Sequence, residues 1–151
     1  DHEIVYDARS KKIVHAGTTD ALWKGMQFCH QSVFVRTALM RRRPFNREYR
    51  IAADFDTIYS LALRGHTFSR KPLVIASVAA SGLSGDKTFA TVREQWLIVR
   101  KLSPGILRDA YFVVQLFWRL LKNSVFAVLP KPLENRLRAR IISRNRNVLS
   151  I

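Results

Sequence analysis

The sequence predicts an α/β fold, and three patterns support this prediction. The segments EIVYD and KKIVHAG flank ARSK and indicate two short strands joined as a hairpin. Apolar residues recur at helical spacing from Ile51 to Ala62, which predicts a helix that ends at Gly65. A longer apolar-rich helical pattern runs from Gly105 to Leu129. Strands and helices are therefore both expected.

The remaining segments predict shorter elements. TTDALWKG predicts a short helix with Thr18 or Thr19 as its cap and Gly25 as its end. SVFVR is β-branched and aromatic, which predicts a buried strand. TALMRRR predicts a helical turn and PFNREY a loop. TFSRKPLVIASVAA predicts one or two strands, SGLSGDK a loop, and KTFATVREQWLIVRKL a helix that ends before Pro104.

The helix predicted between Gly105 and Leu129 has an unusual pattern. Its apolar part is too wide for an ordinary surface helix, whereas charges near its middle disfavour a membrane span. Two interpretations stay open: a helix in the plane of a membrane, or a cap on the domain core. The basic segment LENRLRARIISRNRN follows Pro132 and predicts an amphipathic helix. The polar residues of the helix predicted between Gly105 and Leu129 form one stripe: Arg108, Gln115, Arg119 and Lys122.

Composition limits the class of protein. A chain of 151 residues with a formal charge of +15 is expected to meet polyanionic partners. The single Cys29 excludes an internal disulfide and fits a reducing compartment. The four His and the Cys show no metal-ligand spacing. Asp1 is not an initiator residue, so we expect a piece of a longer protein.

Two acids lie close together in RIAADFD, residues 50–56 of a chain in which acids are scarce. Asp54 and Asp56 are placed at the expected start of a helix. One interpretation makes Asp54 the N-cap and Asp56 an acid that the helix dipole favours. The other makes Asp54 a general base. Spacing alone leaves both interpretations of Asp54 open. The arginines at 41–43 are expected on a solvated face.

Three segments, HQSVFVR, PFNREYRIAADFDTIYSLALRG and VIASVAASGLSG, carry a resemblance. In order and spacing they resemble the second half of a family 2 glycosyltransferase, an inverting enzyme of the GT-A fold. Within that family the chain resembles the bacterial members that build cell-surface polysaccharides, including the colanic-acid type. The resemblance runs from about Glu3 to about Leu102. Asp54 matches the catalytic base of that family, although Ala53 replaces the commoner glutamate before it.

The resemblance implies roles for further residues. His30 and Gln31 match a pair that lines the acceptor cleft, and Asp56 matches a supporting acid. For SGLSG, which contains Gly82 and Ser84, two interpretations stay open: a loop over the sugar or the phosphates, or a plain turn. The family's metal-binding DxD is expected upstream of Asp1, so Mg²⁺ or Mn²⁺ would be bound in the full-length protein and not by this fragment.

The implied reaction transfers a sugar from a nucleotide-diphosphate sugar to an acceptor hydroxyl, with inversion. The acceptor is expected to be a saccharide or a lipid-linked sugar in surface polysaccharide synthesis. Residues 1–103 would form the acceptor-side half of the GT-A domain, and 104–151 an amphipathic helical extension. We expect a cytoplasmic protein in peripheral contact with the anionic inner face of the plasma membrane. This fragment alone would be inactive.

The rival class is a basic module that binds anionic membrane or nucleic acid without chemistry. The charge of +15 supports it. Against nucleic acid, the sequence shows no recognition motif, and its aromatic residues lie mainly in apolar segments. Nucleic acid is therefore not among the expected partners.

Overall fold

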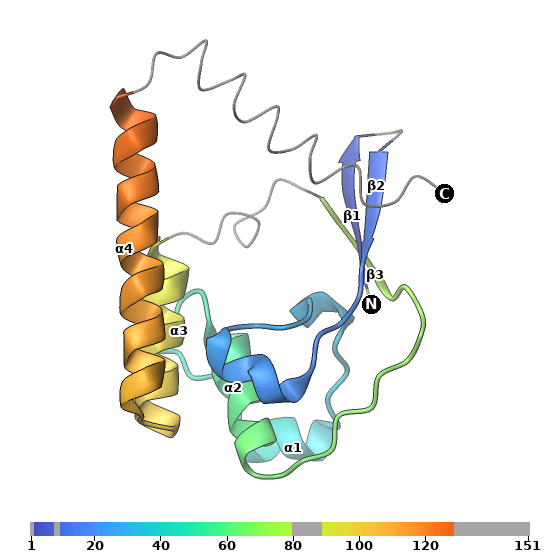
Figure 1. Cartoon of the computed structure of the whole chain (residues 1–151). Coiled ribbons are helices and arrows are strands. Elements are labelled where there is room, and N and C mark those ends of the chain that lie inside the picture. The colour runs from blue at the N-terminus through green and yellow to red at the C-terminus, as the bar shows by residue number, and fades with distance from the viewer. Residues whose placement is uncertain (1, 8–9, 80–88, 129–151) are drawn as a thin grey trace.

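A computed structural model of the chain describes residues 2–7, 10–79 and 89–128 (Figure 1). The predicted hairpin forms, and so do the helices predicted at TTDALWKG, TALMRRR, Ile51 to Ala62, KTFATVREQWLIVRKL and from Gly105, with bounds that differ by a few residues. The amphipathic helix predicted at LENRLRARIISRNRN lies outside the described residues and stays a prediction. Residues 43–52, which include PFNREY, form the predicted loop. The elements, in order, are strands β1 (His2–Asp7) and β2 (Ser10–Val14), 3₁₀ helices η1 (Thr19–Lys24) and η2 (His30–Ser32), helices α1 (Thr37–Arg42) and α2 (Ala53–Leu63), strand β3 (Ala76–Ala79), and helices α3 (Phe89–Leu102) and α4 (Ile106–Val128).

The three strands form one mixed sheet in the order β2-β1-β3. β1 pairs with β2 antiparallel, so that Ile4 lies opposite Lys12, and the register shifts between Val5 and Asp7. On its other edge β1 pairs with β3 in parallel, with Ile4 opposite Val78. Helices and a small sheet thus coexist, in agreement with the predicted α/β class.

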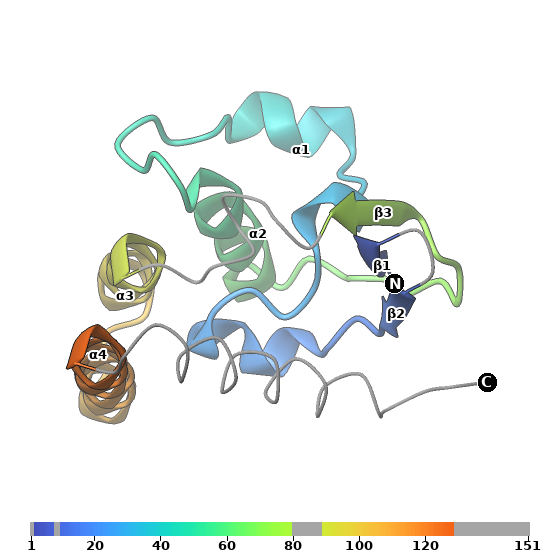
Figure 2. The same ribbon diagram turned by 90° about the horizontal axis from the view of Figure 1, so that it is seen from above.

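Helix α2 lies at the centre of the molecule. Figures 1 and 2 show the sheet on one side of α2, and α3 with α4 on the other. Seven consecutive residues of α2, from Phe55 to Leu61, are buried. Apolar side chains of η1, α3 and α4 complete the core around it. The core cluster comprises Leu22, Ala52, Phe55, Ile58, Tyr59, Val92, Ile98, Val99 and Phe112.

Gly65 ends α2 as the sequence predicts. Its φ of 76° places it in the left-handed region, where glycine has no steric penalty. The Gly65 N–H donates to the carbonyl of Ala62 at 3.0 Å, and the His66 N–H donates to that of Leu61 at 3.1 Å. These two bonds form a Schellman motif and satisfy carbonyls that the helix end would otherwise leave free.

The segment TTDALWKG forms the predicted short helix as the 3₁₀ helix η1. Thr18 occupies the cap position but makes no side-chain capping bond, and Gly25 follows the last residue. Gly25 has φ 115° and ψ −178°. This conformation is open almost only to glycine. Leu22 is the residue of η1 that is fully buried.

The prediction of a buried strand at SVFVR is wrong. Ser32 ends the turn η2, residues 33–36 are irregular, and the Phe34 side chain is 84% exposed. In the described residues the sheet consists of β1, β2 and β3, and none of them pairs with this segment. β-branched and aromatic residues favour a strand only where a neighbouring strand and a packed face are present.

Helix α4 packs against α3 and contributes to the same core. Phe112 is buried, and Tyr111 meets Trp23 of η1 edge-on with 5.3 Å between ring centroids. The indole N–H of Trp96 on α3 donates to Asp109 on α4 at 2.6 Å. Across the described residues, no helix has the length and the hydropathy that a membrane crossing requires.

Gly25 and Gly65 provide a matched pair for testing backbone constraint. A Cβ at Gly25 would lie 2.8 Å from Oε1 of the Gln95 side chain, whereas one at Gly65 would meet nothing within 4 Å. We expect Gly25→Ala to lower the free energy of unfolding by roughly 2–3 kcal/mol. Gly65→Ala should cost about 1 kcal/mol, the usual left-handed penalty. Urea denaturation measures both, and equal losses would contradict the special constraint on Gly25.

Candidate functional site

Glu94 on α3 holds the segment that enters α2. Its carboxylate accepts the backbone N–H groups of Arg50 at 3.3 Å and of Ile51 and Ala52 at 2.9 Å each. Backbone N–H groups before a helix have no partner within the helix, and they cost free energy when left unpaired. One side chain from another helix therefore fixes where α2 begins.

Asp54 does not occupy the N-cap of α2. The cap position is Ala52 and the first helical residue is Ala53, so the interpretation of Asp54 as the N-cap is wrong. Oδ1 of Asp54 accepts the N–H of the next residue, Phe55, at 2.8 Å. Asp54 thus satisfies one amide of the first turn, while Glu94 satisfies those that precede it. Asp54 remains in the first turn, where the helix dipole stabilises a carboxylate.

The structure brings His30 and Asp54 together, although 24 positions separate them in the sequence. Nδ1 of His30, in the turn η2, lies 3.1 Å from Oδ2 of Asp54. The two side chains are 41% and 25% exposed. The carboxylate is therefore oriented by one imidazole and one backbone amide, and solvent or a ligand still reaches it. Such an arrangement provides a fixed proton acceptor at the surface.

Asp56 points in a different direction. It is 3% exposed, and its Oδ2 lies 3.0 Å from Nη2 of Arg43. This ion pair links the residue that follows α1 to the first turn of α2. The prediction that residues 41–43 lie on a solvated face holds for Arg41 and Arg42, which are exposed, and is wrong for Arg43. Asp56 supports the position of α2 and does not face solvent.

Tyr49 lies close to these acids and packs against the core. Burial raises the pKa of the Tyr49 phenol, and the positive charge of Lys101 acts in the opposite direction. The carboxylates of Asp56, Glu48 and Glu94 add smaller increases to this pKa. The phenol therefore stays neutral at physiological pH, as its packing against apolar residues requires.

The other predicted site residues are placed as follows. Gln31 is exposed and lies beside His30 in the turn η2. Gly82 and Ser84 lie outside the described residues, so their predicted role in a loop over the ligand stays a prediction. The structure thus assembles His30 and Asp54 and places Asp56 behind them in the interior.

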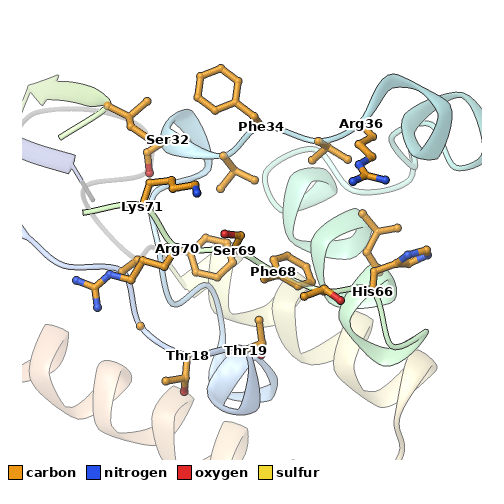
Figure 3. A pocket seen from close by; sticks show the side chains of 18 of the residues that line it. Thr18, Thr19, Ser32, Phe34, Arg36, His66, Phe68, Ser69, Arg70 and Lys71 are labelled. Atoms are coloured by element: carbon orange, nitrogen blue, oxygen red, sulfur yellow. The ribbon is translucent and has the colours of Figure 1, made fainter. Parts of the chain in front are cut away.

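A groove of about 830 Å³ that the sequence did not reveal lies between the irregular segments beside η2. Ser32, two residues after His30, is part of its lining, as are the basic residues Arg36, Arg70 and Lys71 (Figure 3). Phe28 and Phe68 provide apolar wall. The basic dipeptide Arg70-Lys71 was the sequence feature that could have indicated this groove. TFSRKPLVIASVAA predicted one or two strands, and one of them forms as β3, whereas residues 66–75 are irregular.

The described residues do not fit a metal centre. Across residues 2–7, 10–79 and 89–128, no three His, Cys, Asp or Glu side chains gather where they could share an ion. The His30–Asp54 pair supplies two potential ligands, and a divalent cation bound by side chains usually requires more. No step of a reaction is therefore assigned to a metal on these residues.

Comparison with known proteins gives no match for this chain, whether with family models, with curated proteins or with solved structures.

The anchoring role of Glu94 predicts a clear mutational pattern. Glu94→Ala leaves three amides before α2 without their acceptor and should lower the free energy of unfolding by about 1–2 kcal/mol. Glu94→Gln keeps an acceptor oxygen and should cost less. Glu48→Ala is the control, because Glu48 is exposed and its contact with Lys101 spans 3.6 Å. It should stay within about 0.5 kcal/mol of wild type. Similar losses for Glu94 and Glu48 in chemical denaturation would exclude the anchoring role.

The Arg43–Asp56 pair predicts strong coupling. Arg43→Met or Asp56→Asn leaves a mostly buried polar group without its partner and should cost about 2–4 kcal/mol each. The double variant should lose less than the sum of the two, because neither charge is then left unpaired. Arg41→Met, at an exposed arginine of the same triplet, is the matched control. Additive losses in this double-mutant cycle would show that the pair contributes no interaction energy.

Proposed function

We propose that this chain is the acceptor-side half of an inverting family 2 glycosyltransferase of the GT-A fold, with Asp54 as its catalytic base. The observation that carries the proposal is the contact between His30 and Asp54. The resemblance assigned both residues to the active site from separate segments, and their side chains lie 3.1 Å apart. A shared active site requires such proximity, and local geometry does not produce it for residues that are 24 positions apart in the sequence.

The two carboxylate oxygens of Asp54 are held by different protein groups, and each can still accept another hydrogen bond. Each carboxylate oxygen accepts one hydrogen bond from the protein: Oδ1 from the Phe55 amide, and Oδ2 from His30 when its Nδ1 carries the proton. A carboxylate oxygen has two lone pairs, so each oxygen keeps one for an incoming hydroxyl. The two donors hold the carboxylate in a fixed orientation before the acceptor binds.

The proposed step moves one proton and exchanges one bond. The acceptor hydroxyl forms a bond to the anomeric carbon of the donor sugar while its proton passes to the Asp54 carboxylate. The bond between that carbon and the diphosphate breaks, and its electron pair leaves with the nucleotide. Attack from the face opposite the leaving group inverts the carbon. A base of this kind contributes about 10²–10⁴-fold to the rate.

Other residues of the proposal act on position or binding. Asp56, through Arg43, keeps the first turn of α2 in place, and Glu94 fixes the segment before it. Gln31 and the loop with Gly82 and Ser84 would contact the acceptor. The donor nucleotide and its Mg²⁺ or Mn²⁺ would be held by residues outside this chain. The acceptor would be a saccharide or a lipid-linked sugar, at the cytoplasmic face of the plasma membrane.

Asp54→Asn tests the proposal in a protein that includes the donor half. Asn keeps the size of Asp and still accepts the Phe55 amide, but it is a far weaker proton acceptor than a carboxylate. We expect the release of nucleoside diphosphate from uridine and guanosine diphosphate sugars, in the presence of acceptor, to fall by roughly 10²–10⁴-fold. The melting temperature should fall only slightly, because Asn keeps the bond to the Phe55 amide and loses only the interaction of a partly exposed charge with the helix dipole, about 0.3–1 kcal/mol.

Asp109→Asn is the matched control, because Asp109 is also a half-buried carboxylate but lies on α4 and bonds to Trp96. Its turnover should stay near that of wild type. Turnover of the Asp54→Asn protein within about threefold of wild type, at an unchanged melting temperature, would remove Asp54 as the base. Loss of turnover in both variants would mean that turnover falls because the fold is destabilised, and not because a base is lost.

A further inference from the structure

Helix α4 exposes an apolar face to solvent. Between positions 106 and 121, every residue that is exposed is apolar. The exposed fractions are large: 85% for Ile106 and 65% for both Phe117 and Trp118. An ordinary surface helix shows the opposite arrangement, with charged and polar residues outward. The exposed positions are Ile106, Leu107, Ala110, Val113, Val114, Phe117, Trp118, Leu120 and Leu121.

The polar residues of the same stretch are half-buried and bond within the protein. Arg108 donates to the carbonyl of Ser103 at 2.7 Å, and Asp109 accepts the Trp96 indole N–H. Gln115 donates to the hydroxyl of Tyr111 at 3.2 Å. The stripe that the sequence predicts on this helix is thus real, but its described members do not form the solvent-facing side. Asp109, the one acid between positions 106 and 121, is turned toward α3.

The exposed residues form one continuous surface. At 100° per residue they fall within an arc of about 160° around the helix axis. Sixteen residues at 1.5 Å each extend over about 24 Å. Isolated apolar side chains on a surface are common, but a contiguous strip of this length marks a contact surface for a partner or a membrane. Exposure of this apolar strip to water costs free energy.

We propose that this face of α4 docks on the surface of an anionic lipid bilayer, with the helix lying parallel to the membrane plane. α4 lacks the hydropathy for a span, so its apolar arc would enter only the boundary between headgroups and acyl chains. Trp118 and Phe117 both lie in the arc. Trp concentrates at that depth, and both residue types are common on the apolar face of interfacial helices. The inference holds whether or not the chain transfers a sugar.

Charge favours a lipid surface over a second copy of the chain. With a formal charge of +15, two copies repel each other, whereas an anionic bilayer attracts each of them. α3, which packs against α4, exposes Arg93, Arg100 and Lys101. Docking through α4 would leave the sheet directed away from the membrane, because the two lie on opposite sides of α2 (Figures 1 and 2).

Vesicle co-sedimentation of the 151-residue chain tests the proposal. The vesicles are phosphatidylcholine alone, or phosphatidylcholine mixed with phosphatidylglycerol. The test variant is Phe117→Gln/Trp118→Gln, and the control is Phe34→Gln/Phe45→Gln, which removes two exposed aromatic residues away from α4. Gln is a good helix former, so the helix should persist in the test variant, and circular dichroism verifies this.

We expect wild type and control to bind the anionic vesicles and to bind the neutral ones far less. The test variant should bind at least about tenfold more weakly, because its two side chains supply much of the buried apolar area. Raising salt from about 0.1 M to about 1 M should also weaken wild-type binding. Undiminished binding of the test variant, equal binding to both vesicle types, or no binding would overturn the proposal. So would a lipid-free dimer of wild type that the test variant loses, since α4 would then contact a second copy.

Discussion

The carboxylate of Glu94 is the contact on which the arrangement around α2 depends. It accepts the three amides at 50–52, so the chain enters α2 at a fixed place and at a fixed angle to α3. Because α2 is buried along seven consecutive residues, a shift of its start would move the whole core. The same contact leaves the Asp54 carboxylate outside the cap, where Oδ2 meets His30. Because Glu94 of α3 binds the amides before α2, the Asp54 carboxylate is left to contact His30.

The two acids of α2 lie in one helix turn but have different surroundings. Residues two positions apart lie about 200° apart around a helix axis, so Asp54 and Asp56 point in nearly opposite directions. Asp56 points inward and needs the charge of Arg43 to be buried at acceptable cost. Asp54 points outward and keeps access to solvent. The spacing that makes the pair conspicuous in the sequence is therefore what places one acid in the interior and the other at the surface.

Local patterns allowed much of the fold to be predicted. The period of the apolar residues placed α2, and Gly65 marked its end, because both effects act within a few residues. SVFVR failed because a strand requires partners that its own residues do not specify. The contacts of Glu94 with the amides at 50–52 and of Arg43 with Asp56 left no pattern either, since each joins positions far apart in the sequence. Only the resemblance suggested that His30 and Asp54 lie close together, as their contact shows.

Helix α4 shows that a periodic pattern predicts a helix but does not predict which side of it faces the protein. The sequence predicted a narrow polar stripe on an otherwise apolar helix. Polar groups on such a helix satisfy their hydrogen bonds most easily where they face the rest of the protein. Arg108 and Gln115 do so, and the wide apolar arc is then left for the outside. The core contacts of α4 are made by Phe112, which is buried, and by Tyr111 and Leu116, which pack against the core. The longest helix thus closes the core with one side, and the other side is suited to a medium less polar than water.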